Sequence, residues 1–160
     1  TRRETLRVTA IKDGVVEINN GQQIVNLTGG TIRNDFGAVF DPPLQVLPAD
    51  DFQIGKKWIT RSQMALPSTS ETPGGLTGWV EQEMKVVAYE QITVVAGTMS
   101  AYRVEGILRT QSGASGKITY WITSNGSIVK LVREVKIRRR DGGTRDDSWT
   151  REVLRIHKPR

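Results

Sequence analysis

Apolar and polar residues alternate along most of this 160-residue chain, and glycine turns separate one alternating stretch from the next. A period of two places successive side chains on opposite faces of a β-strand. The clearest example carries Tyr102, Val104, Gly106 and Leu108 on one face and Arg103, Glu105 and Arg109 on the other. Helix caps and three-turn apolar stripes are missing from the sequence. The pattern therefore predicts an all-β fold.

Turn dipeptides mark the points where the strands reverse. Asp13-Gly14, Asn20-Gly21 and Asn125-Gly126 supply the positive backbone φ that tight hairpins need. We expect an antiparallel meander of about nine to eleven strands that forms a strongly curved sheet, a half-barrel or a barrel. Asp141-Gly142-Gly143 closes the last hairpin, which is expected to return from Trp149 to Ile156.

One stretch interrupts this pattern. Asp41-Pro42-Pro43 and Pro48 are expected to form a loop or an edge, because proline lacks the amide hydrogen that a central strand donates.

Size and composition favour one domain over residues 1–160. The apolar fraction of 37% supports a core, and the charged fraction of 25% is far from the one-signed composition of disordered chains. No apolar run approaches the roughly 20 residues of a membrane-spanning helix, so no transmembrane segment is expected. The chain has no cysteine, which excludes disulfides and thiolate chemistry.

The positive charge of the chain belongs to its C-terminal part. Eleven Lys or Arg and five Asp or Glu lie between Lys130 and Arg160, an excess that equals the whole formal net charge of +6. Lys136 and Arg138 should share one face of a strand, and Arg151 or Arg155 is expected across from them. The candidate patch for an anionic partner comprises Lys136, Arg138, Arg140, Arg151 and Arg155.

Such a patch has two interpretations. A row of cations can bind phosphate, anionic lipid headgroups or lipopolysaccharide. Alternatively, charge protects an edge strand from aggregation. Nucleic acid is not expected, because the aromatic and basic signature of sheets that bind single strands is missing.

Catalytic apparatus is not recognisable, and no enzyme, metal or cofactor is expected. His157 is the single histidine and lies close to the end of the chain, which makes a Ser-His-acid triad improbable. Gly113 to Gly116 lacks the lysine and helix of a phosphate loop. Ser-Lys pairs and the acids Glu81, Glu83 and Glu105 keep a hydrolase open as a third hypothesis.

Aromatic residues are spread over several expected strands. Most should pack in the core or in cross-strand pairs, and Trp121 should lie on the face opposite to Ile118, Tyr120 and Ile122. An aromatic residue on a curved sheet can also contact an apolar ligand. The candidate ligand-binding residues are Trp58, Trp79, Tyr120 and Trp121.

Several strand and hairpin motifs follow one another between residues 52 and 132. They are Ile54-Gly55-Lys56-Lys57-Trp58, Val86-Val87-Ala88-Tyr89-Glu90, Ile92-Thr93-Val94-Val95-Ala96-Gly97-Thr98, Tyr102-Arg103-Val104-Glu105, Thr119-Tyr120-Trp121, Gly126 and Val129-Lys130. With a G-K-x-W strand, a V-x-V-x-A-G-T hairpin and a Y-W strand in that order, this region resembles a family of uncharacterised proteins, a domain of unknown function, exported by Gram-negative bacteria.

The resemblance implies an export signal upstream of Thr1 and a periplasmic, outer-membrane-associated or lipoprotein-like setting. It also implies an antiparallel sheet similar to that of lipoprotein carriers, without naming functional residues. The first hypothesis is therefore a non-enzymatic protein that binds a lipid, a lipoprotein or another apolar ligand on a curved sheet. The second is an envelope module that docks an anionic partner through the basic C-terminal hairpin.

Overall fold

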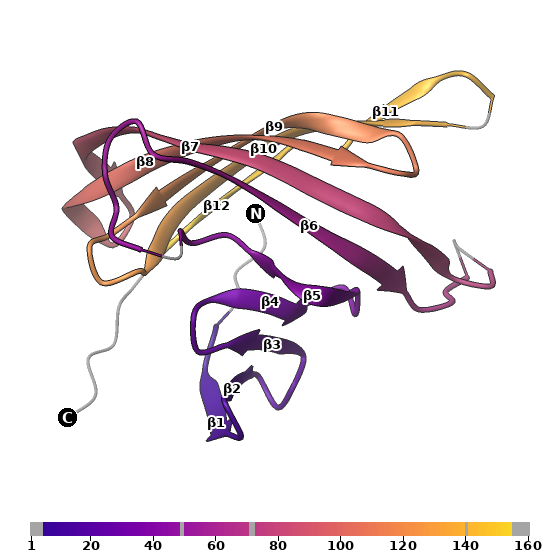
Figure 1. Ribbon diagram of the computed structural model, residues 1–160, viewed down its shortest axis with the longest axis horizontal. Helices are drawn as coiled ribbons and strands as arrows, with labels where there is room; N and C mark the ends of the chain where they lie inside the picture. Colours follow the sequence, from indigo (N-terminus) through magenta and orange to yellow (C-terminus); the bar gives the residue numbers. More distant parts are fainter. Residues whose placement is uncertain (1–4, 49, 71–72, 140, 155–160) are drawn as a thin grey trace. The chain divides into compact units, whose positions relative to one another are not determined.

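The computed structural model describes residues 5–48, 50–70, 73–139 and 141–154. These ranges contain twelve β-strands and no helix (Figure 1), which confirms the all-β prediction. The strands are β1 (Val8–Lys12), β2 (Val15–Ile18), β3 (Gln23–Asn26), β4 (Gly30–Arg33), β5 (Val39–Gln45), β6 (Lys57–Leu66), β7 (Leu76–Val94), β8 (Gly97–Thr110), β9 (Ala114–Ile122), β10 (Ile128–Arg138), β11 (Thr144–Asp146) and β12 (Trp149–Glu152).

Strands that follow one another in the chain are neighbours in the sheet. The order runs from β1 to β11 without a crossover, and β12 pairs with β10. The predicted antiparallel meander is therefore confirmed, and the described strands form an open sheet rather than a closed barrel. The strand count exceeds the expected nine to eleven because the strand after the last hairpin is divided into β11 and β12, which both pair with β10.

The chain divides into two compact units. The first unit comprises Thr1–Ala49 and Thr60–Val80, and the second comprises Asp50–Ile59 and Glu81–Arg160. Strands β1 to β5 thus belong to the first unit, and β8 to β12 belong to the second.

Tight turns in the first unit follow the sequence prediction. Lys12 pairs with Val15, so Asp13 and Gly14 form a two-residue turn with φ of 51° and 79°. Positive φ at both central positions matches the right-handed twist of the flanking strands. The next turn also contains the predicted Asn20-Gly21 pair.

The two prolines lie in a strand, so the prediction of a loop or edge at Asp41-Pro42-Pro43 is wrong. Strand β5 pairs with β6 up to Asp41 and with β4 again from Leu44. Pro42 and Pro43 fall between these paired stretches, where the register with β4 shifts. Their missing amide hydrogens therefore remove no bond from the ladder.

The second unit has one apolar face. The register of β8 with β9 places Val104 opposite Tyr120 and Gly106 opposite Ile118, and all four are buried. The alternation predicted from Tyr102 to Arg109 is thus confirmed. Further buried side chains of this unit include Met84, Val86, Leu108, Ile122 and Val135.

Two glycines allow close packing in this unit. A Cβ on Gly106 would collide with the sulfur of Met84 and would lie 3.1 Å from Ile118 Cγ2. Gly116 lies opposite Val135 in β10, and a Cβ there would stand 2.7 Å from the Val135 Cα and even closer to the Glu134 carbonyl oxygen. The backbones of β9 and β10 therefore leave no room for a side chain at Gly116.

We expect the Gly116→Ala substitution to lower the free energy of unfolding by about 3 kcal/mol or more, because only a shift of the β10 backbone can relieve the clash. Urea unfolding followed by circular dichroism measures this change. Gly143→Ala is the matched control, since its Cβ would meet only the flexible Asp141 side chain, at 3.1 Å. Equal stability losses in the two variants would contradict the close approach of β9 and β10.

Candidate functional site

The face of the second unit opposite to the apolar face carries paired charges. Trp121 lies directly opposite Arg103 on one side and Lys130 on the other. Lys130 lies in turn opposite Glu152, and Glu90 of β7 contacts Arg103. We call these five residues, which come from five strands, the charge-paired row.

Each member of the charge-paired row has a complementary neighbour. Glu90 Oε1 lies 3.3 Å from Arg103 Nε and accepts a hydrogen bond of 2.9 Å from Trp121 Nε1. Lys130 Nζ lies 5.6 Å from the centre of the Trp121 ring and 2.7 Å from Glu152 Oε1. A cation over an indole face is attracted by the electron density of the ring. The positive charges of this row are therefore compensated within the sheet.

Arg103 and four further cations of the unit pair with acids in the same way. The recorded pairs are Arg103–Glu105 at 2.5 Å, Lys117–Glu105 at 3.3 Å, Arg109 with Glu81 and with Glu83 at 3.7 Å, Arg133–Asp147 at 3.2 Å and Lys56–Asp50 at 2.8 Å. Such pairs contribute little stability at an exposed surface. These pairs include Glu81, Glu83 and Glu105, the three acids considered for hydrolase chemistry, and each of them lies beside a cation.

Four cations near the end of β10 differ from these. The hairpin from Glu134 to Asp147, here called the basic hairpin, joins β10 to β11. Four of its cations are exposed, and no described carboxylate lies within 4.0 Å of their charged nitrogens. They are Lys136, Arg138, Arg139 and Arg145.

Two of the four acids of the basic hairpin accept hydrogen bonds from neutral groups. Asp146 lies opposite Lys136 in the ladder, but its Oδ1 accepts a hydrogen bond from the Ser148 hydroxyl. Asp141 Oδ1 accepts a hydrogen bond of 2.9 Å from the Gly143 amide and so shapes the turn. Neither acid is recorded in an ion pair with a cation of the hairpin, so the four exposed cations remain accessible to a partner.

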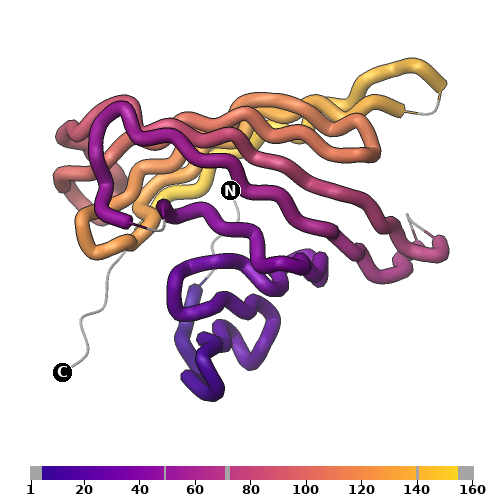
Figure 2. The backbone as a smooth tube through the Cα atoms, viewed as in Figure 1, coloured from indigo at the N-terminus to yellow at the C-terminus, as the bar shows by residue number. Residues whose placement is uncertain are grey.

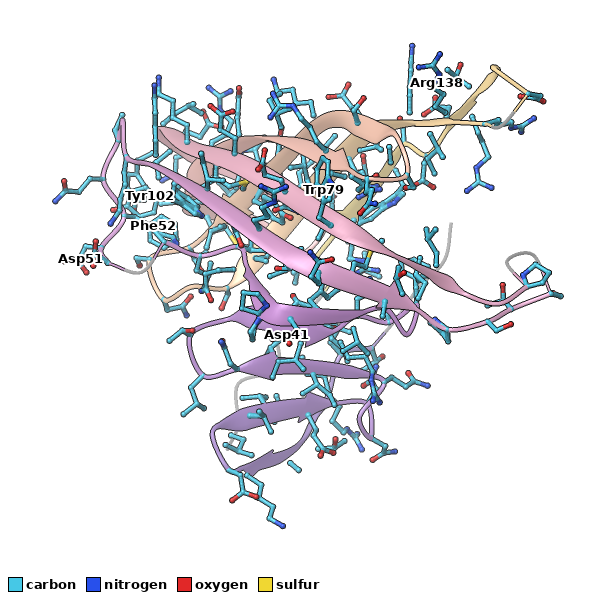
Figure 3. All side chains as sticks on the ribbon, turned by 45° about the vertical axis from the view of Figure 1, so that its right-hand side comes forward. Asp41, Asp51, Phe52, Trp79, Tyr102 and Arg138 are labelled. Carbon is cyan, nitrogen blue, oxygen red and sulfur yellow. The ribbon has the colours of Figure 1, made fainter. Side chains whose placement is uncertain are left out.

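Cations occupy both faces of the basic hairpin. Lys136 and Arg138 share one face, whereas Arg145 lies opposite Ile137 and so occupies the other. The pairing of β10 with β9 ends at Ile137 and Ala114, and the hairpin continues beyond this point (Figures 1 and 2). Figure 3 shows Arg138 on this projecting part. The tip thus presents charge in more than one direction.

The structure brings together part of the predicted patch. Lys136 and Arg138 do share a face, but Arg151 lies opposite Leu131 and not across from them. The register explains the position of Arg151, because β12 pairs with residues 130–133 whereas β11 occupies the place beside Lys136.

Two members of that patch, Arg140 and Arg155, lie outside the described residues, as does His157. The sequence interpretation omitted Arg139 and Arg145 from the patch. The Asp141-Gly142-Gly143 turn, which fixes the register of the last hairpin, was the signal that could have included Arg145.

The four aromatic candidates do not share one face. Tyr120 is buried on the apolar face, while Trp121 belongs to the charge-paired row on the opposite face, as its phase predicted. Trp79 is part of the first unit, where the Arg61 guanidinium lies 5.1 Å from the ring centre. Trp58 is half-buried, and its indole nitrogen has no hydrogen-bond partner among the described residues. The structure therefore places Tyr120 and Trp121 on opposite faces of the sheet in the second unit.

Another aromatic cluster was not expected from the sequence. Phe52 stacks on Tyr102 with ring centres 4.8 Å apart, and Tyr89 lies 4.6 Å from Tyr102 at a tilted angle. Figure 3 shows Phe52 and Tyr102 side by side. These contacts bring the segment before β6 against β8, within the second unit.

The apolar face also contains buried polar groups. Burial raises the pKa of Tyr120 to about 12, against the smaller opposing effects of the Gln82 side chain and the Arg133 charge. The carbonyl oxygen of the Gln82 side chain is buried and has no partner among the described residues. Tyr120 is therefore held as a neutral phenol at neutral pH.

Metal sites and membrane-spanning helices were also sought. The described residues contain no group of three or more His, Cys, Asp or Glu side chains that could hold a metal ion. Over the same part of the chain, no helix has the length and apolar character needed to cross a membrane.

The stability of the fold should fall at alkaline pH through Tyr120. The neutral phenol is favoured in the folded state, so stability is constant below the unfolded pKa of 10.0 and falls as the pH rises toward about 12. By about pH 11, wild type should lose about 1.4 kcal/mol more than Tyr120→Phe, relative to about pH 8. Urea unfolding at the two pH values measures both proteins.

Tyr89→Phe, which removes an exposed tyrosine, is the control for this experiment and should retain the wild-type pH dependence. If Tyr120→Phe and wild type lost the same stability between the two pH values, the buried neutral phenol would be disproved.

Comparisons with known proteins do not place this chain in a family. No family model, no curated protein and no solved structure matches the chain. The resemblance to exported proteins of Gram-negative bacteria stays a prediction, and the functional argument rests on the basic hairpin itself.

Proposed function

We propose that this protein is a non-catalytic binding module that docks on an anionic phospholipid surface through the basic hairpin. One observation carries the proposal: four exposed cations cluster on this hairpin with no carboxylate within 4.0 Å among the described residues, whereas the charge-paired row and its neighbours are compensated. Unpaired cations keep their full attraction for external anions. An anionic surface is therefore attracted most strongly to the basic hairpin.

The arrangement of the cations favours a lipid headgroup layer over other polyanions. A hairpin with charge on both faces can be surrounded by phosphates when its tip enters the headgroup region. A nucleic acid duplex would be met by one face only. The hairpin from 134 to 147 also contains no aromatic residue on which a base could stack.

The expected attraction is modest and sensitive to salt. A lysine or arginine at an anionic membrane surface contributes about 1 kcal/mol, so four of them contribute about 4 kcal/mol. Because the Debye length is about 10 Å at 0.1 M salt, this attraction weakens as ionic strength rises. Docking through this hairpin is therefore reversible.

The proposed setting is the cell envelope, periplasmic or associated with the outer membrane. It is supported by the resemblance of residues 52 to 132 to exported proteins, and anionic lipid surfaces are present there. The alternative, an apolar ligand on the sheet, has weaker support because Tyr120 and Trp121 face opposite sides.

Charge removal on the hairpin should weaken docking. The Lys136→Gln and Arg138→Gln double variant should partition about 30-fold more weakly onto phosphatidylcholine vesicles that contain about one quarter phosphatidylglycerol, at about 50 mM salt. Each substitution removes about 1 kcal/mol of attraction. Vesicle co-sedimentation measures the partition coefficient, and vesicles of phosphatidylcholine alone should retain little of either protein.

Lys57→Gln with Lys85→Gln is the matched control. Both lysines are exposed residues of the same unit, neither has a carboxylate within 4.0 Å among the described residues, and the change in net charge is equal. The control should bind almost as wild type does. Equal losses in the two double variants, or tighter binding of wild type to a DNA duplex than to the anionic vesicles, would refute the proposal.

A further inference from the structure

The dipeptide Asn-Gly occurs twice in this chain, and the structure holds its two copies differently. Asn20-Gly21 lies in the turn between β2 and β3, and Asn125-Gly126 lies in the turn between β9 and β10. The backbone nitrogen of the glycine can attack the side-chain carbonyl carbon of the asparagine before it, because glycine has no side chain to hinder the approach. Both asparagines are exposed to water, so exposure does not distinguish them.

Hydrogen bonds restrain both reacting groups in the turn at Asn125. Its Oδ1 accepts hydrogen bonds from the Thr123 hydroxyl and, at 3.2 Å, from the Ser127 amide. The Gly126 amide donates to the Thr123 carbonyl at 2.9 Å. Rotation of the Asn125 side chain toward the Gly126 nitrogen would break these bonds. The turn between β9 and β10 is therefore protected from the attack.

The turn at Asn20 lacks these restraints. The Asn20 side-chain amide and the Gly21 N–H have no hydrogen-bond partner among the described residues. The Asn20 backbone amide donates to Thr9 Oγ1 at 3.0 Å, which leaves the side chain free to rotate. A long bond of 3.3 Å from the Gln22 amide to the Asn19 carbonyl closes the turn. The two reacting groups can therefore approach each other without the loss of a hydrogen bond of their own.

Backbone conformation also favours reaction at Asn20. The φ angles of Asn19, Asn20 and Gly21 are 52°, 56° and 79°. A left-handed conformation brings Cβ close to the following carbonyl oxygen, so it costs free energy at the two asparagines. Asn125, which the structure also describes, does not have a positive φ. A departure from the folded turn therefore costs less at Asn20 than at Asn125.

We propose that Asn20 is a site of spontaneous deamidation, which converts it to aspartate and isoaspartate. The Gly21 nitrogen loses its proton to hydroxide and forms a bond to Asn20 Cγ. The bond from Cγ to the side-chain nitrogen then breaks, and this nitrogen takes a proton from water and leaves as ammonia, which regenerates the hydroxide. Water opens the resulting cyclic imide at either of its two carbonyl carbons. One water is consumed and one ammonia is released, so no oxidant or reductant takes part.

Both products change the turn between β2 and β3. A carboxylate replaces the neutral amide, so the first unit gains one negative charge at neutral pH. Isoaspartate also adds one carbon atom to the backbone of a turn that lies between the paired residues Ile18 and Gln23. The modification therefore acts on the first unit and not on the basic hairpin.

The test incubates the full chain at mildly alkaline pH and follows both asparagines by peptide mass spectrometry, with chromatography to separate isoaspartate from aspartate. Asn20 should be converted about 30-fold faster than Asn125, the factor expected when two hydrogen bonds hold the Asn125 side chain. In urea, where the turns keep only fluctuating structure, the two rates should agree within about 3-fold.

Thr123→Val is the matched variant, since it removes the hydroxyl that donates to Asn125 and lies in the other unit from Asn20. Asn125 should then be converted about 5-fold faster than in wild type, while the rate at Asn20 stays the same. Three results would overturn the inference: conversion of Asn20 no faster than that of Asn125 in the folded chain, the same ratio of rates in urea as in the folded chain, or an unchanged rate at Asn125 in Thr123→Val.

Discussion

Neighbouring strands of an antiparallel sheet stand about 5 Å apart, so a charged residue on one face always has a side chain directly across from it. The second unit satisfies this constraint with the charge-paired row, where Trp121 lies between Arg103 and Lys130. Glu90 and Glu152 complete the row at its two ends. Five strands thus carry cations and anions in balance, and the opposite face is left to the apolar core. The surface charge of the whole unit depends on this pairing.

The same constraint explains why the basic hairpin differs. Beyond Ile137, strand β10 has no neighbour in β9, and only the short strand β11 lies beside it. No ion pair is recorded there among the described residues, and Asp141 and Asp146 accept hydrogen bonds from the Gly143 amide and the Ser148 hydroxyl instead. The four unpaired cations of the hairpin therefore lie on either side of the point where the sheet narrows to two strands. The proposed interaction surface therefore lies where the pairing of β9 with β10 ends, and not in a cleft.

Local patterns were sufficient to predict much of the fold. Asp13-Gly14 fixed a hairpin because two positive φ angles are needed there, and the alternation from Tyr102 to Arg109 identified the buried face of β8. Features that depend on register were not predictable. Pro42 fits a strand only because the pairing of β5 with β4 shifts beside it. Arg151 does not lie across from Lys136, because β12 pairs with residues 130–133 of β10. Glu90 and Trp121 are 31 residues apart in the chain, so their hydrogen bond could not be predicted without the strand pairing of the sheet.

The central claim is that the basic hairpin, and not the charge-paired row, is where cations without a described carboxylate partner cluster in the second unit. NMR spectra of the isotopically labelled protein, recorded while anionic bicelles are added, test this directly. The account predicts that the signals of residues 136–139 and 144–146 broaden first, while those of Arg103, Trp121 and Lys130 keep their intensity. Early loss of the signals of the charge-paired row, with the hairpin unaffected, would contradict it.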